Sequence, residues 1–224
     1  MDKVKVIEIK EIIIENNDLI AKELKKETDK TGTLVVNIMS SPGSGKTTFL
    51  TRTINSLKDK YRIAVLEADI DGDVDAYKIQ ALGVDAIQLH TGGECHLTAN
   101  MVREGIAGFL DKNYDIIFLE NIGNLVCPAE FDVGADVNIE LLSVPEGDDK
   151  PLKYPLMFKV ANYVIVSKYD TLSYFDFDLN LFTERVKNIK KDIDVIPVSA
   201  LDGFNFDRWL NILEKELKNK KKSR

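Results

Sequence analysis

The sequence predicts an α/β fold in which a mostly parallel sheet is flanked by helices on both faces. Two observations lead to this prediction. Short apolar segments alternate with amphipathic segments along the chain, which is typical of strands and helices that follow one another in a parallel sheet. A glycine-rich loop that ends in Gly45-Lys46-Thr47 comes directly after the first apolar strand and opens a helix. That position is the one a phosphate-binding loop requires, so the predicted fold is that of a P-loop NTPase.

The chain begins with a segment unlike the rest. Val4–Lys26 repeats isoleucine and leucine at helical spacing, with Lys and Glu between them, so we expect a helix. Thr28–Gly32 is polar and ends in glycine, which is typical of a hinge. We therefore predict two parts: an N-terminal helix in residues 1–30 and a P-loop domain in residues 31–224.

Within the second part, strands and helices alternate to the end of the chain. The expected strands are Leu34–Met39, Tyr61–Leu66, Asp85–Leu89, Asp115–Leu119, Tyr163–Ser167 and Asp194–Val198, with Asp136–Ser143 as a further candidate. The expected helices are Lys46–Lys58, Asp73–Leu82, His96–Phe109, Phe177–Lys190 and Phe206–Leu217. The final KNKKKSR run is basic, and we expect a frayed, solvated terminus rather than a binding arm.

Composition excludes some classes of partner. Of the 224 residues, 44% are hydrophobic and 30% are charged, and the formal net charge is −7. An acidic balance argues against general affinity for nucleic acid, which needs clustered positive charge. No apolar run reaches the roughly 18 residues that span a bilayer, and the charged start lacks the apolar core of a signal peptide. We expect a cytoplasmic protein with no nucleic-acid or membrane partner, and two cysteines that are thiols or thiolates.

The loop at residues 40–48 (SSPGSGKTT) carries the first functional prediction. Its glycines let the backbone turn tightly, so that successive N–H groups and the helix N-terminus form a cradle for phosphate. Lys46 places a positive charge against the β- and γ-phosphates, and Thr47 offers a hydroxyl to Mg²⁺. The expected nucleotide-binding residues here are Gly43, Ser44, Gly45, Lys46, Thr47 and Thr48. Ser40 stands where the usual pattern has glycine, a departure that the strand–loop–helix context offsets.

Acidic side chains follow two of the expected strands, where ligands bind in open α/β sheets. The segment from Glu67 to Asp75 holds five acids in nine positions, a density that needs a cation or a helix N-terminus to balance it. For any single acid of this cluster, a cap or a solvated loop position is the stronger interpretation. Glu120 ends an apolar strand, so we expect it to hold Mg²⁺ or to position the attacking water.

Two segments favour guanine as the base. Ser167-Lys168-Tyr169-Asp170 ends a strand with a Lys-x-Asp unit, whose carboxylate can accept two hydrogen bonds from guanine's ring N–H and exocyclic amine. Lys168 can lay its alkyl stem along the base. After the last strand, Ser199 and Ala200 begin a second segment whose backbone could read guanine's carbonyl oxygen. Adenine lacks the donor pair, so we expect GTP rather than ATP.

Soft metal ligands lie in two loops beside the expected nucleotide site. Cys95 and His96 precede a helix, and Cys127 follows the strand of Glu120. Thiolate and imidazole suit Zn²⁺ and Ni²⁺ far better than Mg²⁺. Three ligands are one short of a closed tetrahedral site, which water or a second copy of the chain could complete. From the residues alone, buried cysteines and a packed histidine are the stronger interpretation.

These motifs together resemble a family. SSPGSGKTT, GGECHLTANMV, ENIGNLVCP, the KPLKYP of residues 150–155 and SKYD are similar to the nickel-incorporation GTPases of hydrogenase and urease maturation known as HypB. The resemblance runs from about residue 34 to residue 209. It implies a P-loop GTPase of the signal-recognition, MinD and BioD-like class that hydrolyses GTP slowly, forms a homodimer when GTP is bound and delivers Ni²⁺ to nickel–iron hydrogenase. The implied partners are the hydrogenase large-subunit precursor and a second nickel-maturation protein.

The resemblance also assigns roles to residues and reverses the interpretation of the cysteines. Cys95, His96 and Cys127 fall on the family's Ni²⁺ or Zn²⁺ positions near the dimer interface. The other implied positions are Lys46, Thr47 and Glu120 for phosphate and Mg²⁺, Asp69 and Asp75 in the first switch, and Lys168 and Asp170 for the base. Lys46, Glu120 and Asp75 are the implied catalytic residues. Residues 1–40 contain neither Cys nor His, so a nickel store like that of many bacterial members is not expected here.

Two other functions remain open at this point. One is a related metallochaperone GTPase that serves urease or a cobalamin-dependent enzyme. The other is a nucleotide-binding regulatory or scaffolding protein that turns over little GTP and uses dimerisation as its output.

Overall fold

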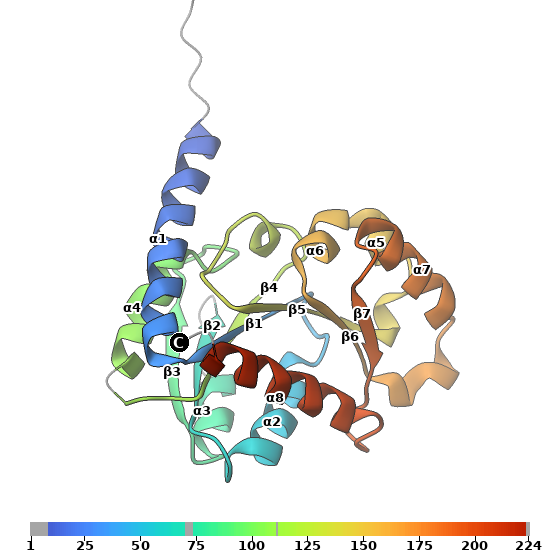
Figure 1. The fold of residues 1–224 in the computed structure, drawn as a ribbon. Coiled ribbons are helices and arrows are strands. Elements are labelled where there is room, and N and C mark those ends of the chain that lie inside the picture. Colours follow the sequence, from blue (N-terminus) through green and yellow to red (C-terminus); the bar gives the residue numbers. More distant parts are fainter. Residues whose placement is uncertain (1–8, 70–73, 111, 223–224) are drawn as a thin grey trace, which may run out of the picture.

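The computed structural model describes residues 9–69, 74–110 and 112–222, and it contains one seven-stranded sheet (Figure 1). The strand order is β3-β2-β4-β1-β5-β6-β7, and every pair of neighbours is parallel. The strands are β1 Leu34–Ser40, β2 Ile63–Asp69, β3 Asp85–His90, β4 Ile116–Gly123, β5 Val137–Ser143, β6 Tyr163–Ser167 and β7 Asp194–Pro197. The predicted fold class is confirmed, and the candidate strand at residues 136–143 is present as β5.

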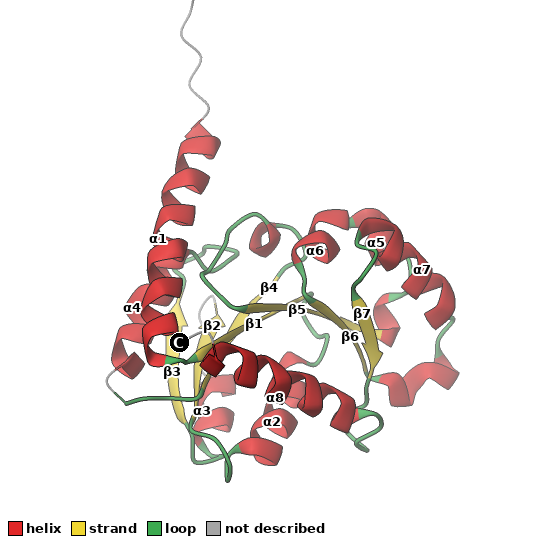
Figure 2. Ribbon diagram, viewed as in Figure 1, coloured by secondary structure: helices red, strands yellow, loops and turns green. Residues whose placement is uncertain are grey.

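Helices cover both faces of the sheet (Figure 2). One face carries α2 (Lys46–Leu57), α3 (Val74–Gln80) and α8 (Phe206–Lys222). The other face carries α1 (Ile9–Thr31), α4 (Ala99–Leu110), α5 (Lys150–Lys153), α6 (Pro155–Val160) and α7 (Leu179–Ile189). Separate apolar clusters fill the space on each side, and Trp209 of α8 is fully buried against Phe49 of α2. Burial of apolar surface on both faces fixes the sheet as a central layer.

Helix α1 packs against the domain that follows it. Leu24 is completely buried in the cluster that α4 also joins, and the side chain of Asn17 donates to Asp132 O and accepts from Ala99 N. The helix continues through Thr31 and ends at Gly32, whose φ of 71° favours glycine. The hinge expected at residues 28–32 is therefore wrong, because these positions complete the last turn of a packed helix. The division into residues 1–30 and 31–224 remains our proposal.

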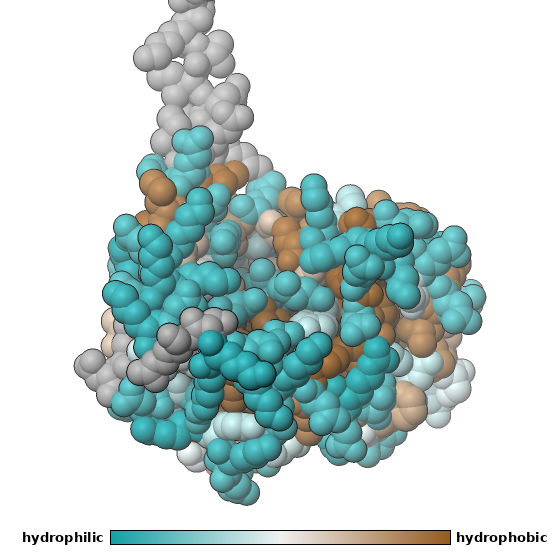
Figure 3. Space-filling model, viewed as in Figure 1, coloured by the Kyte–Doolittle hydropathy of each residue, from teal (hydrophilic) through white to brown (hydrophobic). Residues whose placement is uncertain are grey.

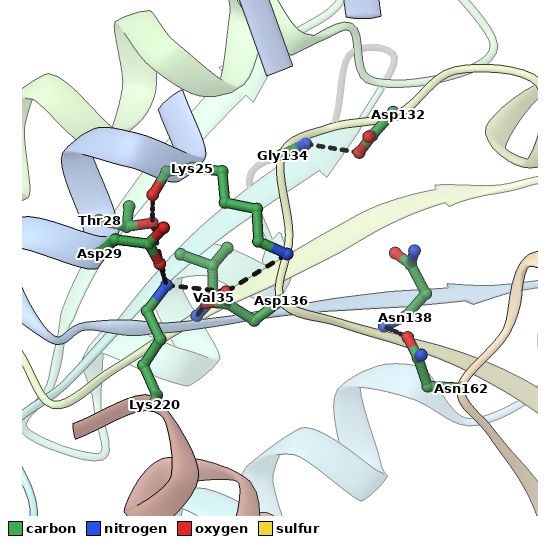
Figure 4. Close-up of polar contacts among 10 residues, drawn as sticks. All are labelled: Lys25, Thr28, Asp29, Val35, Asp132, Gly134, Asp136, Asn138, Asn162 and Lys220. Atoms are coloured by element: carbon green, nitrogen blue, oxygen red, sulfur yellow. Dashed lines mark hydrogen bonds and ion pairs between the residues drawn. The ribbon is translucent and has the colours of Figure 1, made fainter. Parts of the chain in front are cut away.

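The end of α8 corrects a second expectation (Figure 4). The helix extends to Lys222, and Lys220 is buried rather than solvated. Its amine lies 2.7 Å from Asp136 Oδ1 and also contacts Asp29, and Lys25 lies 3.7 Å from the same Asp136 oxygen. We call Lys25, Asp29, Asp136 and Lys220 the Lys220 cluster. Lys220 is held in place because the carboxylates of Asp29 in α1 and Asp136 before β5 receive its amine. Residues 223–224 of the basic run lie outside the described residues.

Two boundaries near the expected site also differ from the prediction. β4 extends to Gly123, so Glu120 lies within the strand rather than at its end. α4 begins at Ala99 because Thr98 caps it, with Oγ1 accepting from Met101 N at 3.3 Å. Residues 95 and 96 therefore lie in the loop before the helix. The short helices α5 and α6 were not predicted, since neither is long enough to show a periodic pattern.

The surface of α8 is hydrophilic on the face shown in Figure 3, which fits a helix whose apolar side lies inward. In the parts of the chain that the structure covers, we find no helix with both the length and the apolar character needed to cross a membrane.

Candidate functional site

A cavity of about 600 Å³ lies at the carboxyl ends of the strands, around the loop that joins β1 to α2. Its lining includes Gly43, Gly45, Lys46, Thr47 and Thr48. The two glycines have φ values of 76° and 96°, which only glycine adopts without strain. The first N–H groups of α2 have no acceptors within the helix, so the loop and helix start form a cradle suited to phosphate.

Two serines of this loop show how the cradle is arranged. Lys46 Nζ donates to Ser40 Oγ at 2.8 Å, so the residue that replaces the usual glycine gives the amine a hydroxyl partner. Ser44 is buried, and its hydroxyl has no hydrogen-bond partner among the described residues. A buried hydroxyl of this kind is costly unless a ligand satisfies it.

Carboxylates meet the loop on its β4 side. Thr47 Oγ1 donates to Glu120 Oε1 at 3.0 Å, which places a hydroxyl and a carboxylate together on the cavity. These are oxygen ligands of the type that Mg²⁺ prefers, so the residues fit a nucleotide-bound Mg²⁺. Asp69, the last residue of β2, also lines the cavity. The side chain of Asp75 lies outside the described residues, and its role stays a prediction.

Glu67 is a cavity residue that the sequence did not single out. It is buried, lines the cavity, and is paired with Glu120 across β2 and β4. In the sequence it was one acid among five, with nothing to separate it from its neighbours. The signal that could have found it is strand alternation, because Glu67 and Asp69 are two residues apart and share a face.

The expected base-reading segments lie side by side, but only part of them reaches the cavity. Lys168 lines the cavity, and its amine donates to Gly43 O at 2.7 Å. Tyr169 N donates to Val198 O, which joins the end of β6 to the end of β7. Asp170 is exposed in the 3₁₀ helix Tyr169–Tyr174.

Ser199 and Ala200 belong to this same region. Ser199 is fully buried, and Ala200 O accepts from Arg52 Nη1 at 3.0 Å. With Asp170, they are absent from the described lining of the cavity. A base would therefore extend beyond the cavity's present outline, past Lys168, to meet them.

The structure brings the three soft ligands together. Cys95 Sγ lies 2.8 Å from Cys127 Sγ and 3.8 Å from His96 Nδ1, and the three ligand atoms all lie within 4.8 Å of one another. Cys127 begins the 3₁₀ helix Cys127–Ala129, shortly after β4. One ion could contact all three residues, and thiolate and imidazole donors fit Ni²⁺ or Zn²⁺.

The protonation of these ligands follows from their surroundings. The hydrogen bond with Cys127, followed by burial, raises the pKa of the Cys95 thiol. Burial lowers the pKa of His96, while the charges of Glu94 and Glu130 act in the opposite direction. The imidazole is therefore held in its neutral, ligand-ready form, whereas a thiol must release its proton when a metal binds.

Packing fixes the ring of His96, and sequence reasoning missed the residue that does so. The ring stacks on Phe131 with centroids 4.0 Å apart and an interplanar angle of 27°. His96 Nε2 is buried and has no hydrogen-bond partner among the described residues. Phe131 follows Cys127 by four positions, so the loop that supplies one ligand also holds another. A single Phe in a loop gives no sequence signal of this role.

Glu140 is a second residue that the sequence did not identify. It is fully buried in β5 and is paired with Met39, one residue before the loop at residues 40–48. Burial, and secondarily the charge of Glu146, raises the pKa of Glu140 well above its usual range, while Lys46 opposes the shift. An acid within the alternating strand pattern was the available signal.

Comparison with known proteins supplies independent information. Residues 34–197 match the family model described as "CobW/HypB/UreG, nucleotide-binding domain". The "Hydrogenase/urease maturation factor HypB" of Helicobacter hepaticus is 45% identical over 216 residues, which cover 95% of this chain and 88% of that protein. The "Hydrogenase maturation factor HypB" of Azotobacter vinelandii is 42% identical over 212 residues, covering 95% of this chain and 70% of that protein.

A solved structure agrees with these sequence relatives. The crystal structure of HypB from Helicobacter pylori in complex with nickel superposes with a TM-score of 0.86 at 39% identity. The superposition covers 91% of this chain and 96% of the other.

Proposed function

The chain belongs to the HypB maturation factors of the CobW/HypB/UreG family, and we propose that its GTP hydrolysis controls the delivery of nickel held by Cys95, His96 and Cys127. It is a GTPase that helps to insert nickel during the maturation of nickel–iron hydrogenase. One observation carries the proposal: three soft ligands converge, and one of them follows shortly after β4, whose last residues line the phosphate cavity.

The nucleotide would lie in the 600 Å³ cavity with its phosphates on the loop at residues 43–48. Lys46 would exchange its bond to Ser40 for the β- and γ-phosphates. Thr47 and Glu120 would hold Mg²⁺ with Asp69 or Asp75 nearby, and the bound ion would offset the charge that develops on the phosphates. Glu120 would orient the attacking water, and its position in β4 on the lining of the cavity supports this role.

Guanine would be selected beyond Lys168. Asp170 would accept hydrogen bonds from the ring N–H and the exocyclic amine, and the backbone at Ser199 and Ala200 would face the carbonyl oxygen. Tyr169 stacks on Phe204 with ring centroids 5.4 Å apart, which holds the two segments together.

Nickel is the cargo rather than a resident cofactor. Two sulfurs and one imidazole leave a coordination position for water, for a donor from a second copy, or for the acceptor protein. We further propose that two copies associate when GTP is bound, that Zn²⁺ competes for the same ligands, and that the protein acts in the cytoplasm. Its partners would be the hydrogenase large-subunit precursor and a second nickel-maturation protein. A relative whose name also includes urease keeps urease as a second acceptor.

The decisive experiment removes both sulfurs. In a Cys95→Ala/Cys127→Ala variant we expect Ni²⁺ affinity to fall by more than about 100-fold, since loss of a ligand exceeds the effect of losing a supporting contact. GTP affinity should stay within about twofold of the unsubstituted protein. Isothermal titration with each ligand makes the measurement, and unchanged Ni²⁺ binding would refute the metal site.

A second substitution tests base recognition. Asp170→Asn replaces an acceptor-only carboxylate by an amide, and we expect GTP affinity to fall by about 10–100-fold while ATP affinity does not fall. Fluorescent analogues of the two nucleotides provide the readout. Equal loss for both nucleotides would remove the guanine assignment and leave the phosphate cradle unaffected.

A further inference from the structure

One residue contacts the phosphate loop through its backbone and the loops of Cys95 and Cys127 through its side chain. Asn124 directly follows β4, and its backbone N–H donates to Ser40 O at 2.8 Å. Its side-chain Oδ1 accepts from Val126 N at 2.8 Å, beside Cys127. Its Nδ2 donates to Cys95 O over a longer distance of 3.4 Å.

The residue before it makes this junction stiff. Gly123 is paired with Ser40 across β4 and β1, and a Cβ added to it would lie 2.9 Å from the backbone N and Cα of Pro42. No other residue type fits such a close approach without a shift of the loop. A displacement of Pro42 would therefore press directly on Gly123, the residue before Asn124.

Asn121 makes a second connection of a different kind. Its Oδ1 accepts from Leu97 N, next to His96, and from Ile122 N, and the side chain is fully buried. Asn121 Nδ2 donates to Asn37 of β1, so this residue ties the histidine loop to the sheet itself. The histidine side of the site is thus anchored to the core, while the cysteine side is anchored to the end of β4.

We propose that Asn124 is the positioning residue through which nucleotide at the phosphate loop sets the relative placement of Cys95 and Cys127. The proposal rests on the proposed function, because it presumes that the cysteines carry metal and that the loop binds GTP. Ordering of the loop by phosphate moves Ser40 and Pro42 against residues 123 and 124. The side chain of Asn124 then carries the displacement to both cysteine loops at once.

Coupling between two sites is a free energy and is reciprocal, so it can be measured from either ligand. The Asn124→Ala variant keeps the backbone N–H bond to Ser40 O and loses both side-chain bonds. We expect Ni²⁺ affinity without nucleotide, and GTP affinity without metal, to change by no more than about threefold. The factor by which GTP changes Ni²⁺ affinity should fall from a value in the usual range of about 5–150 towards one.

The test measures Ni²⁺ binding with no nucleotide, with GDP and with a non-hydrolysable GTP analogue, in the unsubstituted protein and in three variants. Asn124→Asp keeps the acceptor for Val126 N and loses the donor to Cys95 O, which separates the two bonds. Asn100→Ala, on the surface of α4, where the side chain bonds Glu104, is the matched control. The thiolate-to-Ni²⁺ charge-transfer absorption reports the geometry of the cysteines directly.

The expected result is a nucleotide-dependent absorption change in the unsubstituted protein and in Asn100→Ala that is lost in Asn124→Ala. A coupling factor in Asn124→Ala equal to that of the unsubstituted protein would overturn the proposal, and so would an unsubstituted protein in which GTP does not alter Ni²⁺ affinity. Failure of the proposed function looks different, because Ni²⁺ would then bind equally well without the two cysteines.

Discussion

The two ends of the parallel sheet differ in how their buried polar groups are satisfied. Where the strands begin, the Lys220 cluster closes the molecule with charges that satisfy one another (Figure 4). Towards the other end, from the middle of β5 to the loops that follow the strands, several buried polar atoms have no partner among the described residues, namely Ser44 Oγ, His96 Nε2 and both carboxyl oxygens of Glu140. We call the end where the strands begin the closed end, because its polar groups bond one another and stabilise the fold. We call the other end the open end, because its buried polar groups are available for ligands or protons.

The closed end ties together distant parts of the chain. The Lys220 side chain is 6% exposed and Asp136 is 11% exposed, and Lys220 Nζ also lies 3.5 Å from Thr28 Oγ1. Asp136 Oδ2 accepts from Val35 N at 3.0 Å, which links the cluster to the start of β1. The last helix, the first helix and two central strands therefore meet at one amine. Such a junction is sensitive to loss of a single charge.

The largest effect is expected at this closed end. Lys220→Met keeps the alkyl stem and removes the amine, so Asp136 is left as a buried charge whose nearest amine is the more distant one of Lys25. We expect the free energy of unfolding to fall by about 3–5 kcal/mol. Urea denaturation makes the measurement. GTP and Ni²⁺ affinities of the folded fraction should not change, because the cluster lies at the opposite end of the strands.

The neighbouring Lys222 provides the control. It is exposed, and Lys222→Met should change stability by less than about 0.5 kcal/mol. A Lys220→Met protein as stable as Lys222→Met would show that the cluster contributes nothing and that the two ends are not specialised as we describe.

The two ends also differ in how much of their structure could be predicted from the sequence. All seven strands and the phosphate loop followed from hydrophobic pattern and glycine placement, because these are local properties of the chain. The convergence of Cys95 with Cys127 was expected from the resemblance to a family, because the residues alone favoured buried cysteines with no metal role. Lys220 was expected to be solvated, since nothing in a basic run shows that carboxylates more than 80 residues away receive one of its amines. Phe131 was missed for the same reason, because its partner His96 lies in another loop. Glu67 and Glu140 were missed because the sequence does not show that their strand positions are buried.

A smaller effect is expected at Glu140, on the open end. Its pKa is raised in the folded state by burial and by Glu146, so the folded protein keeps this proton to a higher pH than the unfolded chain does. Stability is therefore greatest below the pKa of the unfolded carboxyl and falls as pH rises towards the pKa of the folded one. The slope of this contribution is about 1.4 kcal/mol per pH unit at most.

Glu140→Gln removes the titration while keeping the shape. We expect this variant to lose the pH-dependent component, so that its stability relative to the unsubstituted protein increases as pH rises above the usual pKa of a glutamate carboxyl. Parallel urea titrations at several pH values give the comparison. Identical pH profiles for the two proteins would mean that Glu140 finds a partner in solution. The buried polar groups at the open end would then not lack partners as we describe.

The smallest effect is expected at Ser44. It tests the comparison of the two ends most directly, because removal of one oxygen atom separates an effect on stability from an effect on nucleotide binding. Ser44→Ala removes a buried hydroxyl that has no partner among the described residues, so we expect the free energy of unfolding to stay within about 0.5 kcal/mol or to rise slightly. GTP affinity should fall by about 2–10-fold, which corresponds to the net contribution of one typical hydrogen bond. Ser56→Ala, which loses a bond to Arg52 O on the outer side of α2, is the control for hydroxyl removal. Stability and nucleotide affinity are measured on the same preparations. A Ser44→Ala protein that unfolds more easily yet binds GTP normally would assign this hydroxyl to the fold, and polar groups at the open end would then serve stability as those at the closed end do.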